Sequence, residues 1–476
     1  MDEDTCTETT ALLSKPKQQT PTPLPKLQLG IVMFVQICEP TASQSIYPYI
    51  NQLVSELDII GGDKRKVGYY AGLESLFYVT EATTVLQWSR ASDYIGRKPI
   101  LVIGLFGTAL SMLCFGMSRT FWALVVSRCL TGLLNGNVGV MKSVMGDLTD
   151  RSNRAQALAY LPIVWDLGAA FGFYIGGQLS QPQLRFPSLF SGQFWRDYPY
   201  FLPSLATGSL VFFAGMIVLL FFKETAPSKK PCPLGDRQDS ESNGSSPVSS
   251  RSELSSSSRP LALRQLLTFP ILISVSNYIA LAFLDISLRA LVPLVFAMPL
   301  AIGGLALPPA KIGAILAVQS MAIVVFQLLF FARFIRRFGE RRVMIGGMSM
   351  YLFVFALFPV ISITVQASGR TPIVWALVAC LLALSVALDM SYGAIFMFLT
   401  ASAPKNSRGT VNGLGQTSVS VARAIGPALS TSLFSLSVER NLLGGQAIYA
   451  VFFAISACAV ILATHLPAEV WDEENA

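Results

Sequence analysis

Long apolar runs dominate the sequence and constrain its fold more than any other feature. Each run is about 20 residues long, the length that a helix needs to cross the hydrocarbon core of a bilayer. Inside hydrocarbon, backbone N–H and C=O groups must pair within the spanning segment, and an α-helix achieves this. We therefore predict an all-α membrane protein with twelve spans. They cover about residues 29–50, 68–88, 99–118, 120–142, 155–179, 199–222, 268–298, 311–332, 342–363, 372–400, 409–434 and 444–464.

The composition is that of a chain solvated by lipid rather than by water. Of the 476 residues, 52% are hydrophobic and 13% are charged, and the mean hydropathy is +0.54. Soluble domains carry about 25% charged residues. The formal net charge of +7 is spread over several polar loops, as is typical of membrane topology signals. We therefore expect a lipid bilayer as partner and no nucleic acid.

The sequence contains no motif for metal binding, phosphate binding or nucleophilic catalysis. The seven cysteines show no CxxC spacing, and most of them fall inside apolar runs, so neither a metal centre nor a disulfide framework is expected. The sequence has no GxxxxGK[ST] phosphate-binding loop. It also has no nucleophile–base pair at a plausible spacing. We expect no enzyme activity, no cofactor and no metal site.

A polar linker divides the spans into six and six. It contains Ser255-Ser-Ser-Ser258 and several prolines, with too few apolar residues to fold alone. Most Lys and Arg residues outside the spans lie on the same side of the membrane as this linker, which places both termini in the cytosol. The predicted segments are a disordered cytosolic N-terminus (1–28), an N-terminal six-helix bundle (29–222), a cytosolic linker (223–267), a C-terminal six-helix bundle (268–465) and a cytosolic tail (466–476).

The two halves carry a weak internal repeat. Arg154 precedes Gly172 by 18 residues, and Arg408 precedes Gly426 by the same interval. Each Arg stands at the start of a span, after a loop on the cytosolic side. Repeated six-span halves are known from transporters, whose substrate sites lie between the halves near the middle of the bilayer.

The loop between the second and third spans reads Ser89-Arg-Ala-Ser-Asp-Tyr-Ile-Gly-Arg-Lys-Pro99. Its order of Asp93, Gly96, Arg97 and Lys98 resembles the signature loop between spans 2 and 3 of the major facilitator superfamily. The resemblance implies a major facilitator fold of two pseudo-symmetric six-helix bundles, in which this loop clamps the cytosolic side and releases as the halves rock. The alternative is an ordinary basic loop.

The second half contains a counterpart of this loop with reversed charges. Arg336 and Glu340 stand where Asp93 and Arg97 stand in the first half. We therefore expect the two loops to be unequal clamps, with the regulated gate in the first half.

Span 4 contains a basic residue within its apolar run. Arg128-Cys-Leu-Thr-Gly-Leu-Leu-Asn-Gly136 resembles the span 4 pattern of the superfamily, in which the Arg is linked to proton coupling. A charge inside the bilayer costs about 2.5–3.5 kcal/mol on insertion scales, so Arg128 needs a partner. The alternative to proton coupling is a structural ion pair.

Small residues recur in span 5. Gly168, Gly172, Gly176 and Gly177 resemble the span 5 motif of the antiporter branches, although Phe173 replaces the usual Pro. The second half keeps a Gly-Pro pair, Gly426-Pro427, at the equivalent position. The resemblance implies antiport. The alternative is simple helix packing, because small residues at this spacing let helices approach closely.

Ionisable residues within the spans are the strongest sign of transport that the residues themselves provide. Such residues usually face a polar cavity and one another. We predict Glu39 and Asp166 as cavity or protonation residues, because a carboxylate removed from water can take up and release a proton near neutral pH. Asp285 and Arg289 lie four residues apart on one helical face and can simply neutralise each other. The full set is Glu39, Glu74, Glu81, Asp166, Asp285, Arg289, Asp389 and Arg423, beside Arg128 and Lys142.

Three further segments narrow the resemblance to one branch. Residues 408–427, with Ile37-Cys-Glu-Pro40 and Ser45-Ile-Tyr-Pro48 of span 1, are similar to the fungal and plant zinc-induced-facilitator-like transporters, within the twelve-span drug:proton antiporter group. The resemblance implies a small organic substrate, which could be a drug, a metabolite or a metal chelator.

Proton-coupled antiport that exports such a solute is therefore the predicted function, with small molecules and protons as partners and a monomer as the acting form. The alternatives are a proton symporter that imports a nutrient, and a non-transporting membrane receptor or scaffold. Plasma and vacuolar membranes are both open as locations. Glu8-Thr-Thr-Ala-Leu-Leu13 has the acidic dileucine spacing of vacuolar sorting signals, although so short a pattern also occurs by chance.

Overall fold

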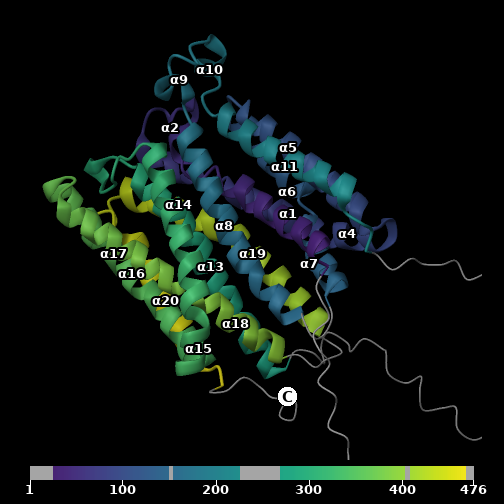
Figure 1. The fold of residues 1–476 in the computed structure, drawn as a ribbon. Helices are drawn as coiled ribbons and strands as arrows, with labels where there is room; N and C mark the ends of the chain where they lie inside the picture. The colour runs from purple at the N-terminus through teal and green to yellow at the C-terminus, as the bar shows by residue number, and fades with distance from the viewer. Residues whose placement is uncertain (1–24, 150–153, 226–267, 403–407, 468–476) are drawn as a thin grey trace, which may run out of the picture.

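The computed structural model describes residues 25–149, 154–225, 268–402 and 408–467, and within these ranges every regular element is a helix (Figure 1). The first half comprises α1 (Lys26–Gln44), α2 (Ile50–Ser55), α3 (Val67–Ala71), α4 (Glu74–Ile95), α5 (Arg97–Gly116), α6 (Phe121–Leu134), α7 (Asn137–Leu148), α8 (Arg154–Leu179), α9 (Pro182–Arg185), α10 (Gln193–Asp197) and α11 (Phe201–Phe221). The second half comprises α13 (Phe269–Ala297), α14 (Pro309–Phe326), α15 (Ala332–Phe338), α16 (Glu340–Ser368), α17 (Pro372–Leu388), α18 (Met390–Ala401), α19 (Arg408–Glu439) and α20 (Ala447–Thr464).

These helices follow the twelve predicted spans. Within the described ranges, nine helical stretches are long and apolar enough to cross a membrane. The other three predicted spans are covered by α1, α4 and α8, which carry Glu39, the pair Glu74 and Glu81, and Asp166 respectively. Because these three spans hold acids that the bilayer would not solvate, they have to face other protein groups.

Spans 4 and 10 hold equivalent places in the two halves, and each is assigned as two helices. Span 4 breaks between α6 and α7, where Asn135 leaves the helical conformation with φ −80° and ψ 58°. In span 10, α17 and α18 meet at Asp389, which keeps helical dihedrals of φ −66° and ψ −18°. The distortion of the backbone is therefore confined to span 4.

The repeat also extends to the backbone of the two short loops. Gly96, between α4 and α5, has φ 114° and ψ 156°. Gly339, between α15 and α16, has φ 78° and ψ 161°. Only glycine adopts this region without strain. The two loops therefore make the same turn, although their charges are reversed.

The halves meet along two helix pairs, α8 with α14 and α4 with α19. Both pairs make close backbone contacts at one end of the bundle. This end, beyond which α9 and α10 lie in Figure 1, is here called the distal end. A Cβ atom added to Gly177 of α8 would lie 2.8 Å from the Cα of Gly313 in α14, and one added to Gly72 would lie 2.9 Å from the Cα of Ala428 in α19. The halves are thus packed backbone to backbone at this end.

Three hydrogen bonds strengthen the distal contact. The Tyr69 hydroxyl donates to Glu439 at 2.8 Å. The backbone N–H of Ala428 donates to the Ser75 hydroxyl at 2.8 Å. The Gln178 amide donates to the Ala310 carbonyl at 3.0 Å. The distal end is therefore closed, and the end with the 89–99 loop is here called the linker end.

Gly177→Ala tests the backbone contact between α8 and α14. The new methyl group would lie 2.6 Å from the Pro309 carbonyl oxygen, so the helices have to move apart, at a cost of about 1–3 kcal/mol. We expect a lower melting temperature of the purified protein in detergent. Gly346→Ala is the control, because a Cβ at Gly346 would meet no described atom within 4 Å. Equal melting temperatures for the two variants would contradict this packing.

Candidate functional site

A partly buried arginine, with 18% of its side chain exposed, lies among three aspartates near the middle of the bundle. The Arg289 Nε atom donates to both carboxylate oxygens of Asp285 at 3.1 Å, one turn away on α13. Its Nη2 atom lies 3.7 Å from Asp166 and 3.7 Å from Asp389. Asp166 comes from α8 in the first half, whereas the other members belong to the second half. Arg289 therefore forms an ion bridge between the halves.

Neutral polar groups complete this central cluster. The Tyr392 hydroxyl donates to Asp285 at 3.0 Å, and the Gln327 amide donates to Asp389. Gln327 begins a π-helical turn, Gln327–Phe331, between α14 and α15; such turns often occur at functional sites. The Tyr278 ring lies beside those of Tyr392 and Phe396, with centroids 6.5 and 5.3 Å away. The cluster thus has a charged side and an aromatic side.

Three aspartates share the single Arg289 side chain as their ion-pair partner, so acidic groups outnumber basic ones in this cluster. The exposed fractions of Asp166, Asp285 and Asp389 are 3%, 8% and 4%. The Oδ1 atom of Asp166 accepts no hydrogen bond from the described residues. Arg423 of α19 interacts electrostatically with Asp285 and Tyr392 but forms no ion pair within the described structure. Because unpaired buried charge is costly, the negative charge of this cluster is incompletely compensated among the described residues.

A second acidic cluster lies in the first half. Asn135, at the break in span 4, donates to Glu39 of α1 at 3.1 Å and to Glu81 of α4 at 3.3 Å. The exposed fraction of Asn135 is 2%. Its amide therefore needs these acceptors. The interruption of the helix is what places this amide between two carboxylates.

Arg128 has Glu74 as its carboxylate partner, at 3.9 Å. Its guanidinium also lies over the Phe115 ring, 4.2 Å from the centroid, which is a favourable arrangement for a cation. The side chain is fully buried. The partner that the sequence required therefore exists, although the distance is long for an ion pair.

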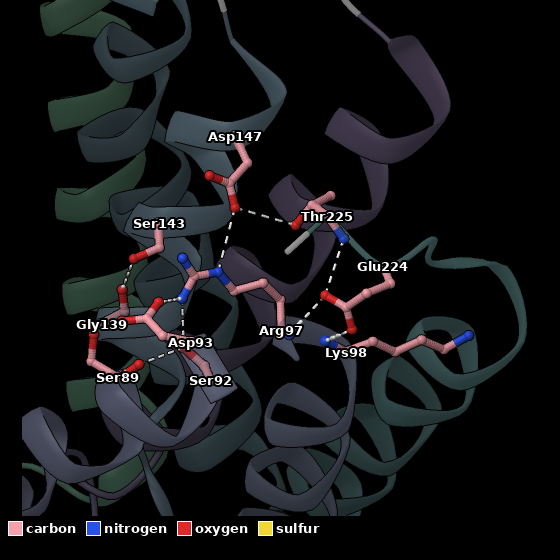
Figure 2. A network of polar contacts seen from close by, with 10 residues as sticks. All are labelled: Ser89, Ser92, Asp93, Arg97, Lys98, Gly139, Ser143, Asp147, Glu224 and Thr225. Atoms are coloured by element: carbon pink, nitrogen blue, oxygen red, sulfur yellow. Dashed lines mark hydrogen bonds and ion pairs between the residues drawn. The ribbon is translucent and has the colours of Figure 1, made fainter. Parts of the chain in front are cut away.

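The 89–99 loop forms a polar network at the linker end (Figure 2). The Arg97 guanidinium lies 2.6 Å from Asp93, donates to the Ser92 hydroxyl at 2.6 Å and donates to Asp147 of α7 at 3.4 Å. Arg97 is buried, with an exposed fraction of 8%. It therefore ties the end of α4 to the end of α7.

The same network is capped by a carboxylate from the end of span 6. Glu224 accepts from the backbone N–H groups of Arg97 at 2.8 Å and Lys98 at 3.1 Å, which are free donors at the start of α5. Carboxylates stabilise helix N-termini through these bonds and the helix dipole. Thr225 donates to Asp147 at 3.5 Å. Four helix ends of the first half are thus cross-linked.

Gly96→Ala tests the loop. A Cβ there would lie 2.6 Å from the Glu224 carboxylate, and the backbone conformation adds about 1–3 kcal/mol of strain for any residue other than glycine. Gly339→Ala is the matched control: it carries the same strain, but its Cβ would meet no described atom within 4 Å. We expect a larger fall in melting temperature for Gly96→Ala. Equal falls would contradict the capping role of Glu224.

The glycines of span 5 pack α8 against its neighbours. A Cβ at Gly168 would lie 2.5 Å from the Ile37 carbonyl oxygen of α1, and one at Gly172 would lie 2.6 Å from that of Thr41. Gly176 faces the Ser45 backbone, and Gly177 faces α14 as described above. In the second half, a Cβ at Gly426, beside Pro427, would lie 2.5 Å from the Ile286 side chain of α13. Close helix contact accounts for each of these glycines.

Four polar residues of these clusters escaped the sequence analysis: Asn135, Asp147, Glu224 and Gln327. Asn135 had a usable signal, because Asn135-Gly-Asn137 is turn-forming in the middle of an apolar run. The others gave none, since their partners lie far away in the chain. The described residues also contain no group of three or more His, Cys, Asp or Glu arranged to hold a metal ion.

The family profile described as Major Facilitator Superfamily matches residues 32–427, and a second match covers residues 278–471. The chain belongs to the major facilitator superfamily. It is 32% identical to the major facilitator-type transporter psiT2 of Psilocybe cyanescens, over 93% of this chain and 90% of that protein. It is 28% identical to the multidrug transporter mfsB of Aspergillus fumigatus, over 95% and 84%.

A plant protein and a solved structure are also similar to this chain. ZINC INDUCED FACILITATOR-LIKE 1 of Arabidopsis thaliana is 26% identical, over 92% of this chain and 90% of that protein. The crystal structure of a D-xylose–proton symporter matches with a TM-score of 0.66 at 13% identity, over 92% of this chain and 97% of that chain. The major facilitator fold and the resemblance to the zinc-induced-facilitator-like branch are thereby confirmed. The protein is a multi-pass membrane transporter and not an enzyme.

Proposed function

We propose that this transporter exports a small organic solute from the cytosol in exchange for protons. The observation that carries the proposal is the bridge from Arg289 to Asp166, which joins the halves through a cluster with more acids than bases. Relatives named as a multidrug transporter and an efflux pump support the direction. The aromatic side of the cluster, formed by Tyr278, Tyr392 and Phe396, offers a surface for an organic molecule.

Proton binding at Asp166 links charge to movement in this proposal. A neutral Asp166 no longer attracts Arg289, so the ion bridge between the halves weakens and the bundle can rock. A solute bound in the central cluster contributes its own contacts and favours release of the proton. Alternating occupation by solute and proton therefore produces exchange.

The first-half loop has a structural part in this cycle. Its cross-links through Arg97 and Glu224 keep four helix ends together, so that the first half moves as one body at the linker end. We propose Asp93, Gly96, Arg97 and Arg128 as the gating and coupling residues of this half. Glu39 and Glu81 complete the polar lining, with Asn135 between them.

We also propose the orientation and setting of the molecule. The linker end and both termini face the cytosol, as the distribution of basic residues indicates, and the chain acts as a monomer in a plasma or vacuolar membrane. The dileucine pattern Glu8–Leu13 lies outside the described residues. A protease added to sealed cells should leave the 226–267 linker intact and cut it after permeabilisation; the reverse would contradict the orientation.

Transport by purified protein in proteoliposomes tests the exchange. Three fluorescent probes serve as solutes: ethidium, rhodamine 123 and fluorescein. We expect an imposed pH gradient to drive at least one of them against the proton flow. Movement that ignores the gradient would contradict proton coupling, and movement in the same direction as protons would support the symport alternative.

Asp166→Asn tests the proposed proton site. The amide keeps the size of the side chain but cannot take up a proton, so the gradient-driven rate should fall about tenfold, a typical size for coupling between linked sites. Exchange of the probe at equal pH on both sides should remain. Asp197→Asn is the control, because Asp197 forms an exposed ion pair with Arg119 at the distal end. Gradient dependence that survives in Asp166→Asn would contradict the assignment.

A further inference from the structure

One buried carboxylate of span 2 is outside the mechanism above. Glu74, Tyr78 and Glu81 are spaced by four and three residues on α4, so they share one helical face. Their exposed fractions are 3%, 6% and 9%. The rise of the helix separates Glu74 from Glu81 by about 10 Å. A buried polar file thus runs along α4 from the distal end towards the acidic cluster around Asn135.

The charge of Glu74 is poorly compensated. The Oε1 atom of Glu74 is 3.9 Å from Arg128 and accepts no hydrogen bond from the described residues. The Nε and Nη1 atoms of Arg128 likewise donate none. The Arg128 cation instead rests on the Phe115 ring. A fully buried carboxylate with so distant a partner is costly to keep ionised.

Other polar groups around Glu74 also lack well-formed hydrogen bonds. Tyr47 and Tyr49, in the turn after α1, interact electrostatically with Glu74. The Tyr47 hydroxyl also interacts with Tyr78, and the Tyr49 hydroxyl with Ser204, but neither contact has the geometry of an ordinary hydrogen bond. On α4 itself, Tyr78 interacts with both Glu74 and Glu81, and also with Arg423 of α19. Unsatisfied buried polar groups gathered in one place point to a ligand that they bind during function.

This cluster is connected to the distal surface. The Tyr49 ring stacks on that of Tyr200, with centroids 5.1 Å apart. The Tyr200 hydroxyl donates to the exposed Glu56 at 2.9 Å. A row of ionisable side chains therefore leads from Glu56 at the surface to Glu74 in the interior.

Glu74 also lies beside the contact that closes the distal end. The next residue, Ser75, accepts the N–H of Ala428 from the second half at 2.8 Å. Gly72, two residues before Glu74, packs on the backbone of Ala428. When the halves separate at this end, the surroundings of Glu74 are the first part of α4 to meet water.

We infer that Glu74 is a second proton-binding residue of this transporter, placed at the distal gate and separate from the central cluster. Opening of the gate lets the Glu74 carboxylate take a proton from water, and closure buries the neutral acid. The inference rests on the proposed proton coupling.

Infrared titration of the purified protein tests proton binding directly and needs no substrate. Wild type should show an absorption band from a protonated carboxyl group in dry surroundings that disappears as the pH rises. Glu74→Gln should lose this band, and Glu74→Asp should keep it at a shifted position. A band unchanged in Glu74→Gln would overturn the inference, whatever the transport assays show.

Ethidium transport in proteoliposomes tests the role of the proton. In Glu74→Gln, we expect a gradient-driven rate about tenfold below wild type, with exchange at equal pH retained and Glu74→Asp restoring part of the gradient response. Glu439→Gln is the matched control, because it removes the charge from the acceptor of the Tyr69 hydrogen bond at the same gate without removing a buried carboxylate; it should keep its gradient response. Equal gradient responses of Glu74→Gln and wild type would overturn the coupling role of Glu74. A wild type without any gradient response would instead contradict the proposed function, and the infrared titration would still decide proton binding at Glu74.

Discussion

The ion bridge from Arg289 to aspartates of both halves is the interaction on which the central site depends. Each charge placed mid-membrane on an isolated helix costs about 2.5–3.5 kcal/mol on insertion scales. Arg289 offsets part of that cost for Asp285 through two hydrogen bonds, and for Asp166 and Asp389 through longer contacts. Contacts of 3.7 Å are weak enough to break, so the bridge holds the halves together without fixing them.

Interrupted helices make such clusters possible. An unbroken helix satisfies its own backbone and offers only side chains, whereas a break turns polar groups towards the interior. Asn135 occupies the break of span 4, whereas Asp389 lies at the junction of α17 and α18 in span 10 with helical dihedrals. Each contacts acids or bases from other helices. The two halves thus place a polar side chain in the corresponding span, an amide in one half and a carboxylate in the other.

The fold was largely predictable from the sequence. The thickness of the bilayer sets the length of a span and charged residues are disfavoured within it, and both features can be recognised along the chain. The i, i+4 pair of Asp285 and Arg289 was predictable for the same reason, as a local feature of one helix. The approach of Asp166 to Arg289 was not, since it depends on how α8 and α13 are placed across the two halves. Gln327 and Glu224 stayed hidden because a π-turn and a cap become recognisable only when their distant partners are known.

The two loops at the linker end share a backbone conformation but differ in their charges and contacts. Gly96 and Gly339 share a glycine-only conformation, which a reversal of nearby charges leaves unchanged. Glu224 packs against the first glycine and caps α5, whereas the second glycine has open space around its Cα among the described residues. In the second loop, Arg341 instead donates to the Thr464 carbonyl at the end of α20. Among the described residues, the first loop cross-links four helix ends, whereas the second loop makes this one side-chain contact with another helix. In the proposed transport cycle, the first-half loop therefore keeps the helix ends of its half together.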